Sequence, residues 1–258
     1  PSSFFDAPNS SLIKRICHRN LGIGSDGILI GPLPSKSCNY RLRIFNPDGS
    51  EAEKSGNGLR IFSCALWDEG CVGEEPFTIE TLGGSVTCRV HDDAKTVTVE
   101  MGDVSFSSKD IPVSGPIRNV INEPLKIGKE VLTISAASVG NPHCVVITET
   151  LSELVVKRLG PKIETHPSFP KKINVQFMKV ISRDTIQIEI WERGAGYTLA
   201  SGSSSTAAAA VARKLGHCDD MINVYMPGGK LMVSFNKEGH ATMTGPVTRV
   251  CSGTISNE

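Results

Sequence analysis

Two stretches of the chain carry the same order of polar and apolar positions. Each starts with Ser-Gly, passes through a turn of small residues into an apolar body, and ends at a glycine fifteen residues after the serine: Ser55–Gly70 and Ser201–Gly216. Serine is a favoured N-cap residue and glycine a favoured helix stop. Both stretches therefore predict a helix.

The segments after the two helices match as well. Alternating apolar and polar residues predict three strands in each case, at 77–81, 85–90 and 96–101 and at 223–226, 230–235 and 240–244. A Gly-Gly pair precedes the second strand of each set, and the offset is 146 residues at the helices and 143 at the glycine after the last strand. This shared order favours an internal duplication over coincidence.

The duplication predicts an α+β protein of two pseudo-symmetric halves. We place the first half at residues 1–105, with a C-terminal strand at about 246–258 packing back on it, and the second half at residues 106–245. The segment 104–117 is rich in Ser, Pro and Gly and is the expected linker.

One glycine motif matches a dinucleotide-binding fingerprint but lacks the structural context that the fingerprint requires. Gly22-Ile-Gly24-Ser-Asp-Gly27 matches the G-x-G-x-x-G dinucleotide fingerprint, which needs a strand before it and a helix after it. Here a helical pattern at 11–20 precedes the motif and a strand at 28–30 follows it. We interpret it as the turn that ends a helix and enters a strand.

Composition narrows the class of protein. The 258 residues contain 27 Lys+Arg and 27 Asp+Glu, so nothing in the net charge indicates nucleic-acid binding. No apolar run is long enough for a transmembrane helix, and the polar start does not resemble a secretory signal. The eight cysteines form no CxxC motif, which predicts reduced, mostly buried thiols in a cytoplasmic protein.

Polar motifs between the apolar segments predict one small ligand. A helix N-terminus offers free N–H groups and a positive dipole end, so the starts at Gly56-Asn57 and Gly202-Ser203 suit one carboxylate. Glu192 suits an ammonium group and Arg193 a second carboxylate. Each motif taken alone is equally compatible with a structural turn. Together they indicate a small zwitterion between the halves.

At these residues the chain resembles diaminopimelate epimerase, one of the cofactor-independent amino-acid racemases. The resemblance runs from Leu12 to about Val250 and rests on the segments 22–27, 46–60, 140–144, 174–178, 192–202 and 244–246. It implies two domains, each a barrel-like curled sheet around a central helix, with the active site in a cleft between them. It also implies a small amino-acid substrate, lysine biosynthesis, no metal, no pyridoxal phosphate and a possible homodimer.

The resemblance assigns a role to each candidate residue. The amides of Gly56, Asn57, Gly202 and Ser203 would hold the α-carboxylate, and Asn46 and Glu192 the α-amino group. Asn141, Asn174 and Arg193 would bind the distal end, and His143 would lie beside the first base. The two bases act on opposite faces of the α-carbon, at the positions of Ser55 and Ser201.

Those two positions depart from the family, which has cysteine at both. A thiol at a helix N-terminus reaches a useful pKa, whereas a serine hydroxyl needs an activating neighbour. The family's opening Gly-Asn-Asp-Phe motif is absent from this sequence, and Tyr197 stands where a glutamate is frequent. Three interpretations stay open at this point: an epimerase with replaced bases, a same-fold isomerase or dehydratase, and an amino-acid-binding protein without turnover.

Overall fold

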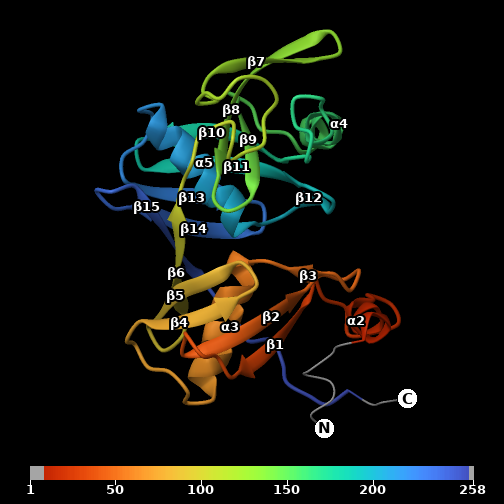
Figure 1. The fold of residues 1–258 in the computed structure, drawn as a ribbon, viewed down its shortest axis with the longest axis vertical. Helices are drawn as coiled ribbons and strands as arrows, with labels where there is room; N and C mark the ends of the chain where they lie inside the picture. Colours follow the sequence, from red (N-terminus) through yellow and green to blue (C-terminus); the bar gives the residue numbers. More distant parts are fainter. Residues whose placement is uncertain (1–8, 256–258) are drawn as a thin grey trace.

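A computed structural model describes residues 9–255 and shows one curled mixed sheet wrapped around two central helices (Figure 1). The first half contains α2 (Ser10–Cys17), β1 (Ile28–Leu33), β2 (Tyr40–Phe45), β3 (Glu51–Ala52), α3 (Gly56–Asp68), β4 (Phe77–Thr81), β5 (Gly84–His91) and β6 (Thr96–Asp103).

The second half is larger. It contains β7 (Glu123–Ile127), β8 (Glu130–Ser138), β9 (Pro142–Ile147), α4 (Glu153–Glu164), β10 (Asn174–Ser182), β11 (Thr185–Glu192), β12 (Gly196–Thr198), α5 (Gly202–Lys214), β13 (Met221–Met226), β14 (Gly229–Phe235) and β15 (His240–Pro246). The order of strands across the sheet is β1-β2-β4-β5-β6-β15-β14-β13-β11-β10-β9-β8-β7. The predicted α+β class and the strands predicted after each central helix are confirmed.

The two central helices begin and end as predicted. Ser55 caps α3 by accepting a hydrogen bond from the Gly58 amide at 3.1 Å, and Ser201 caps α5 by accepting one from the Ser204 amide at 3.5 Å. Both helices close with a glycine in the left-handed region, Gly70 at φ 69° and Gly216 at φ 74°. Glycine enters this region without the steric cost that a Cβ imposes.

The pseudo-twofold relation is exact at the centre of the sheet. β6 and β15 pair antiparallel, and Thr98 lies opposite Thr244, with hydroxyl oxygens 2.7 Å apart. These threonines are 146 residues apart, as are the two helix starts. The twofold axis therefore passes between them. A β-bulge at Ala241/Thr242 shifts the register of this pair by one residue further along β15.

Strand pairing repeats this symmetry on each side. β2 pairs parallel with β4 and antiparallel with β3, and β11 pairs parallel with β13 and antiparallel with β12. The second half also has β7 and β8, and β9 pairs parallel with β10. These three strands have no counterpart among the described residues of the first half.

The main hydrophobic core runs through both halves without interruption. It joins the buried faces of α3 and α5 to the strands on either side of β6 and β15, and a second core lies under β7–β10 and α4. In α5, Ala207–Ala210 are all buried, because small side chains let the surrounding strands approach the helix closely. The domain boundary between residues 105 and 106 stays a prediction.

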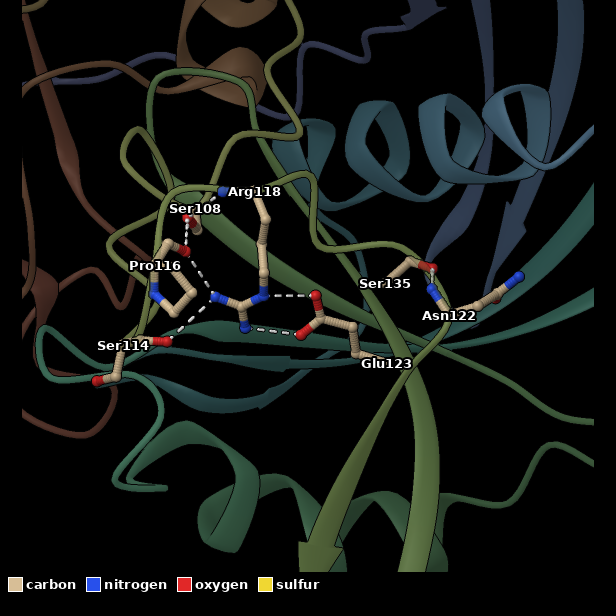
Figure 2. A network of polar contacts seen from close by, with 7 residues as sticks. All are labelled: Ser108, Ser114, Pro116, Arg118, Asn122, Glu123 and Ser135. Carbon is tan, nitrogen blue, oxygen red and sulfur yellow. Dashed lines mark hydrogen bonds and ion pairs between the residues drawn. The ribbon is translucent and has the colours of Figure 1, made fainter.

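The expected linker is a folded part of the second half. Ser105 exchanges backbone hydrogen bonds with Ser138, and Ile111 is 1% exposed within the second core. Figure 2 shows how the following turn is held: Arg118 forms a two-pronged ion pair with Glu123, with N–O distances of 2.7 Å, and donates to the carbonyls of Ser114 and Pro116. Polar composition alone did not reveal these contacts.

Three further predictions meet the structure here. Residues 247–255 form no strand, so the expected C-terminal strand at about 246–258 is wrong over its described part; there the chain is held by single contacts, Val247 N to Lys95 O and Arg249 to Asp68. The motif at 22–27 leads from α2 into β1, so it is a turn and not a dinucleotide loop. All eight cysteines are free, and five of them are buried.

Within residues 9–255, no helix has the length and apolar character needed to span a bilayer.

Candidate active site

The starts of α3 and α5 meet between the halves. A Cβ built on Gly56 would lie 3.6 Å from the Gly202 Cα, and one built on Gly202 would lie 3.5 Å from the Gly56 Cα. Both Cβ positions would also press on the Met243 side chain beneath them, at 3.0 and 2.7 Å. Glycine is therefore what allows two helix N-termini to approach this closely. Their unpaired N–H groups and positive dipole ends combine into a site for an anion.

Ser55 and Ser201 are the N-cap residues of these two helix starts. Ser55 is half-buried and Ser201 is buried. Beyond its capping bond, the Ser201 hydroxyl lies 3.5 Å from the Ser203 hydroxyl. In the described part of the chain neither hydroxyl is hydrogen-bonded to a histidine or a lysine, and the one group suited to accept a proton is the Glu192 carboxylate, which faces Ser201.

Glu192 lies at the end of β11, beside the start of α5. Burial raises the pKa of its carboxyl group, the Ser201 and Thr198 hydroxyls that face it act in the opposite direction, and the charge of Asp26 raises it further. Asp26 comes from the turn after α2, so two carboxylates from different halves face the same region. Asp26 is exposed and already forms an ion pair with Arg19, so Glu192 is the carboxylate of the two that is left for a ligand cation. Sequence reasoning gave Asp26 no role.

Asn46 occupies the matching place in the first half. It follows β2 as Glu192 ends β11, and the two residues are 146 positions apart. Its amide nitrogen donates to the Ser50 hydroxyl at 3.0 Å within its own turn. Asn46 thus belongs to a fixed turn, and within residues 9–255 its side chain makes no hydrogen bond to another predicted site residue.

A buried chain of polar groups supports the start of α5. The Asn141 amide oxygen accepts from His143 Nε2 at 2.9 Å, and the Asn141 amide nitrogen lies 3.5 Å from the Ser203 hydroxyl. The Gln176 amide donates to the Ser204 hydroxyl at 3.0 Å and faces the His143 ring. His143 is fully buried, and burial lowers its pKa to about 3. The ring is therefore neutral and carries its proton on Nε2, because an amide oxygen only accepts.

His143 is hydrogen-bonded to the Asn141 amide oxygen, so it orients that side chain. A place for His143 beside the first base stays a prediction. Gln176 completes the arrangement and was not assigned a role from the sequence. The signal for it was available, since Asn174 and Gln176 alternate on a strand that is otherwise apolar.

Asn174 and Arg193 form a second unit. The Asn174 amide donates to the Pro142 carbonyl at 2.9 Å and accepts from the Arg193 backbone amide at 2.9 Å. Asn174 therefore fixes two loops relative to each other. The Arg193 side chain is exposed and donates to the Lys171 carbonyl at 3.1 Å, which leaves most of its guanidinium available to a ligand.

Asn57 differs from the other predicted residues in having a charged partner. Its amide oxygen accepts from Arg60 Nη2 at 3.0 Å, so its amide nitrogen is directed away from the guanidinium. The structure thus joins Asn141, Ser203, Ser201 and Glu192 around α5, and Gly56 and Asn57 at α3. Serine hydroxyls, amides and one carboxylate are suited to hold a zwitterion.

Comparison with known proteins identifies relatives over nearly the whole chain. The family model for diaminopimelate epimerase matches residues 3–107 and 135–250. A diaminopimelate epimerase 2 from a Nostoc species is 59% identical over 246 residues, covering 95% of this chain and 86% of that protein. The diaminopimelate epimerase of Desulfitobacterium hafniense is 37% identical over 258 residues, covering 99% and 90%.

Solved structures share the fold at low identity. A probable proline racemase from Agrobacterium radiobacter, solved with bound carbonate, superposes with a TM-score of 0.70 at 16% identity and covers 99% of this chain and 84% of that one. A hydroxyproline epimerase from Agrobacterium vitis, solved with bound trans-4-hydroxy-L-proline, gives a TM-score of 0.66 at 15% identity, covering 94% and 80%. The predicted architecture of two related halves is that of these proteins.

Proposed function

This chain belongs to the diaminopimelate epimerase family, and we propose that it interconverts LL- and meso-diaminopimelate by inverting one α-carbon. The observation that carries the proposal is the meeting of two helix N-termini that have residues 55 and 201 as their N-caps.

Substrate binding follows from the charges around this point. The α-carboxylate lies against the amides of Gly56, Asn57, Gly202 and Ser203, where the two helix dipoles favour negative charge. The α-ammonium group lies toward Glu192 and Asn46. The distal end of the substrate reaches Asn141, Asn174 and the exposed guanidinium of Arg193.

Inversion needs one group to remove the α-proton and a second to deliver a proton to the opposite face. Residues 55 and 201 hold these two positions. The bond electrons of the departing proton move onto the α-carboxylate, and the two helix starts stabilise the negative charge that develops there. Serine is a poor group for both transfers because its hydroxyl loses a proton far less readily than a thiol, and among the described residues Ser55 has no activating neighbour. We therefore expect this chain to bind substrate well and to exchange its α-proton slowly.

Proton exchange tests the proposal. Meso- and LL-diaminopimelate are incubated in D₂O and followed by NMR, with the chain itself and with Ser55→Cys/Ser201→Cys. The double variant should exchange and invert the α-carbon at least about 100-fold faster than the parent, the lower range for a positioned acid–base pair. Each single cysteine variant serves as a control and should exchange without efficient inversion.

Binding without exchange by any of these proteins would favour an amino-acid-binding protein. Loss or migration of an amino group would favour a dehydratase or a different isomerase on the same fold.

The proposal has three further parts. The enzyme acts without pyridoxal phosphate, so borohydride treatment should leave exchange by the double cysteine variant unchanged. It forms a homodimer, which light scattering after gel filtration measures. It acts in the cytoplasm, where its eight unpaired cysteines stay reduced.

A further inference from the structure

Arg60 is a buried cation with no carboxylate partner. It is 9% exposed, and no ion pair to it exists among the described residues. Its guanidinium donates to the Gly56 carbonyl at 3.4 Å and to the Asn57 amide oxygen at 3.0 Å, and Nη1 also contacts the Met243 sulfur at 3.5 Å. Nε has no hydrogen-bond partner. A buried charge without a counter-ion is costly to the folded protein.

The location of this charge points to its use. Its partners Gly56 and Asn57 are the first two residues of α3, the same residues whose amides face the anion site. α3 has no acidic residue in its first turn, so nothing on the helix offsets either the guanidinium or the helix dipole. Met243 contacts the guanidinium and lies against both helix starts, so all these groups form one packed unit.

The other half has no such charge. The residue 146 positions after Arg60 is Thr206, whose hydroxyl donates to the Gly202 carbonyl at 2.9 Å. Both residues thus tie down the carbonyl of the first helical glycine, but only one brings a cation. The neighbourhood is shaped to admit it, because a Cβ at Gly245 would lie 3.2 Å from Arg60 Nε and 2.1 Å from Leu231.

We propose that Arg60 is a positioning residue of the anion site, whose buried charge is neutralised by the α-carboxylate of the bound amino acid. The inference rests on the proposed function, since it takes the ligand to be an amino acid bound at the two helix starts. The guanidinium acts through Gly56 and Asn57: it holds their geometry and adds positive potential behind their N–H groups. Burial lowers the pKa of Arg60 to about 10, so the cation persists at neutral pH.

The test compares ligands that differ only at this carboxylate. Calorimetry measures the binding of 2-aminopimelate and of its 1-carboxamide, whose single amino group fixes which end lies at the helix starts. Arg60→Met should bind 2-aminopimelate about 30-fold less tightly than the parent, the lower range for unpairing a buried charge, and the carboxamide within about threefold. Arg60→Lys keeps the charge and should recover most of the lost affinity.

Thr206→Val is the matched control from the other half. It removes the equivalent hydrogen bond without changing charge, so both ligands should lose affinity by the same small factor, about threefold or less. The melting temperature of unliganded Arg60→Met should equal or exceed that of the parent, because an apolar residue there removes an unpaired buried charge. If Arg60 had only a structural role, Arg60→Met would have a lower melting temperature than the parent and would lose affinity for both ligands by the same factor. That result would overturn the inference.

A second arm needs no amino-acid ligand. Acetate should raise the melting temperature of the parent above its value in acetamide at equal ionic strength. The same comparison should give a smaller increase for Arg60→Met. Equal effects on the two proteins, including no effect on either, contradict the role of Arg60. Failure of the parent to bind 2-aminopimelate or diaminopimelate, together with the expected acetate result, contradicts only the proposed function.

Discussion

The two halves have equivalent helix starts, but the charged side chains beside those starts have opposite signs. In the first half, Arg60 lies beneath the start of α3, and Asn46 occupies the turn beside it. In the second half, 146 positions later, Thr206 and Glu192 hold the equivalent places. The first half thus contributes a buried cation and the second a half-buried carboxylate. A backbone duplicated in this way is symmetric, whereas its ligand is a zwitterion, and the side chains supply the polarity that the backbone lacks.

The supporting contacts differ in the same way. The start of α5 rests on a neutral chain of amides, hydroxyls and one histidine, and β8, β9 and β10 cover it. The start of α3 rests on one guanidinium and Met243. We therefore expect the contacts that support the start of α5 to respond to pH and to lost hydrogen bonds, and those that support the start of α3 to respond to the loss of the Arg60 charge.

The largest effect should come from the carboxylate of the second half. Glu192→Gln removes the charge opposite the substrate ammonium while keeping the shape, and we expect about 100-fold weaker binding of diaminopimelate by calorimetry. Asn46→Ala, the equivalent change in the first half, should cost less than about tenfold, since it removes a neutral hydrogen bond. Pimelate, which lacks the amino groups, is the control ligand. Equal losses for both variants would contradict the division of charge.

Acid should destabilise the protein through His143. The unfolded histidine takes up a proton near pH 6.5, whereas burial lowers the pKa to about 3 in the folded protein. Stability is therefore retained above pH 6.5 and lost as the pH falls toward 3. Between pH 6.5 and 5 the free energy of unfolding should fall by about 2 kcal/mol from this group alone. Urea titrations measure it, with His143→Gln as the variant expected to lose this part of the slope; an unchanged slope would contradict a neutral buried ring.

Replacing the first glycine of each helix by alanine tests how closely the two helix starts pack against each other and against Met243. Gly202→Ala should lower the free energy of unfolding by about 2 kcal/mol and Gly56→Ala by about 1 kcal/mol, because the first Cβ lies closer to Met243. Chemical denaturation measures both. In a Met243→Ala background the difference should shrink; a difference that persists there would mean that Met243 does not set the spacing.

The smallest difference is expected where the halves are most alike. Gly70→Ala and Gly216→Ala each place a Cβ on a residue with φ near 70°, so each should cost about 1 kcal/mol in thermal or urea unfolding. The two losses should agree within the error of measurement. A clear inequality would show that the duplicated helix ends are not energetically equivalent.

Much of the duplicated framework was predictable because its signals are local. Ser55 and Ser201 as caps, Gly70 and Gly216 as stops, and the strands after each helix all follow from short-range preferences. The three strands unique to the second half did not stand out as a unit, because the parallel pairing of β9 with β10 joins segments separated by α4.

The site was predictable as a set of residues but not as a set of contacts. Glu192 and the two helix starts lie where their motifs suggested. The Asn174 amide, however, uses both its nitrogen and its oxygen in hydrogen bonds to loop backbone, and the His143 ring is hydrogen-bonded to Asn141. Arg60 was given no role from the sequence, because arginine is seldom buried without a partner and nothing in its local sequence indicates burial.

One measurement tests the central claim, that two helix starts hold a single α-carboxylate between residues 55 and 201. It is a crystal structure of this chain with meso-diaminopimelate. Because this chain is expected to transfer the α-proton slowly, the bound amino acid should stay intact. The account predicts the α-carboxylate on the amides of Gly56, Asn57, Gly202 and Ser203, with the Ser55 and Ser201 hydroxyls facing opposite sides of the α-carbon. A carboxylate bound at only one helix start, or both serines on the same face, would contradict it.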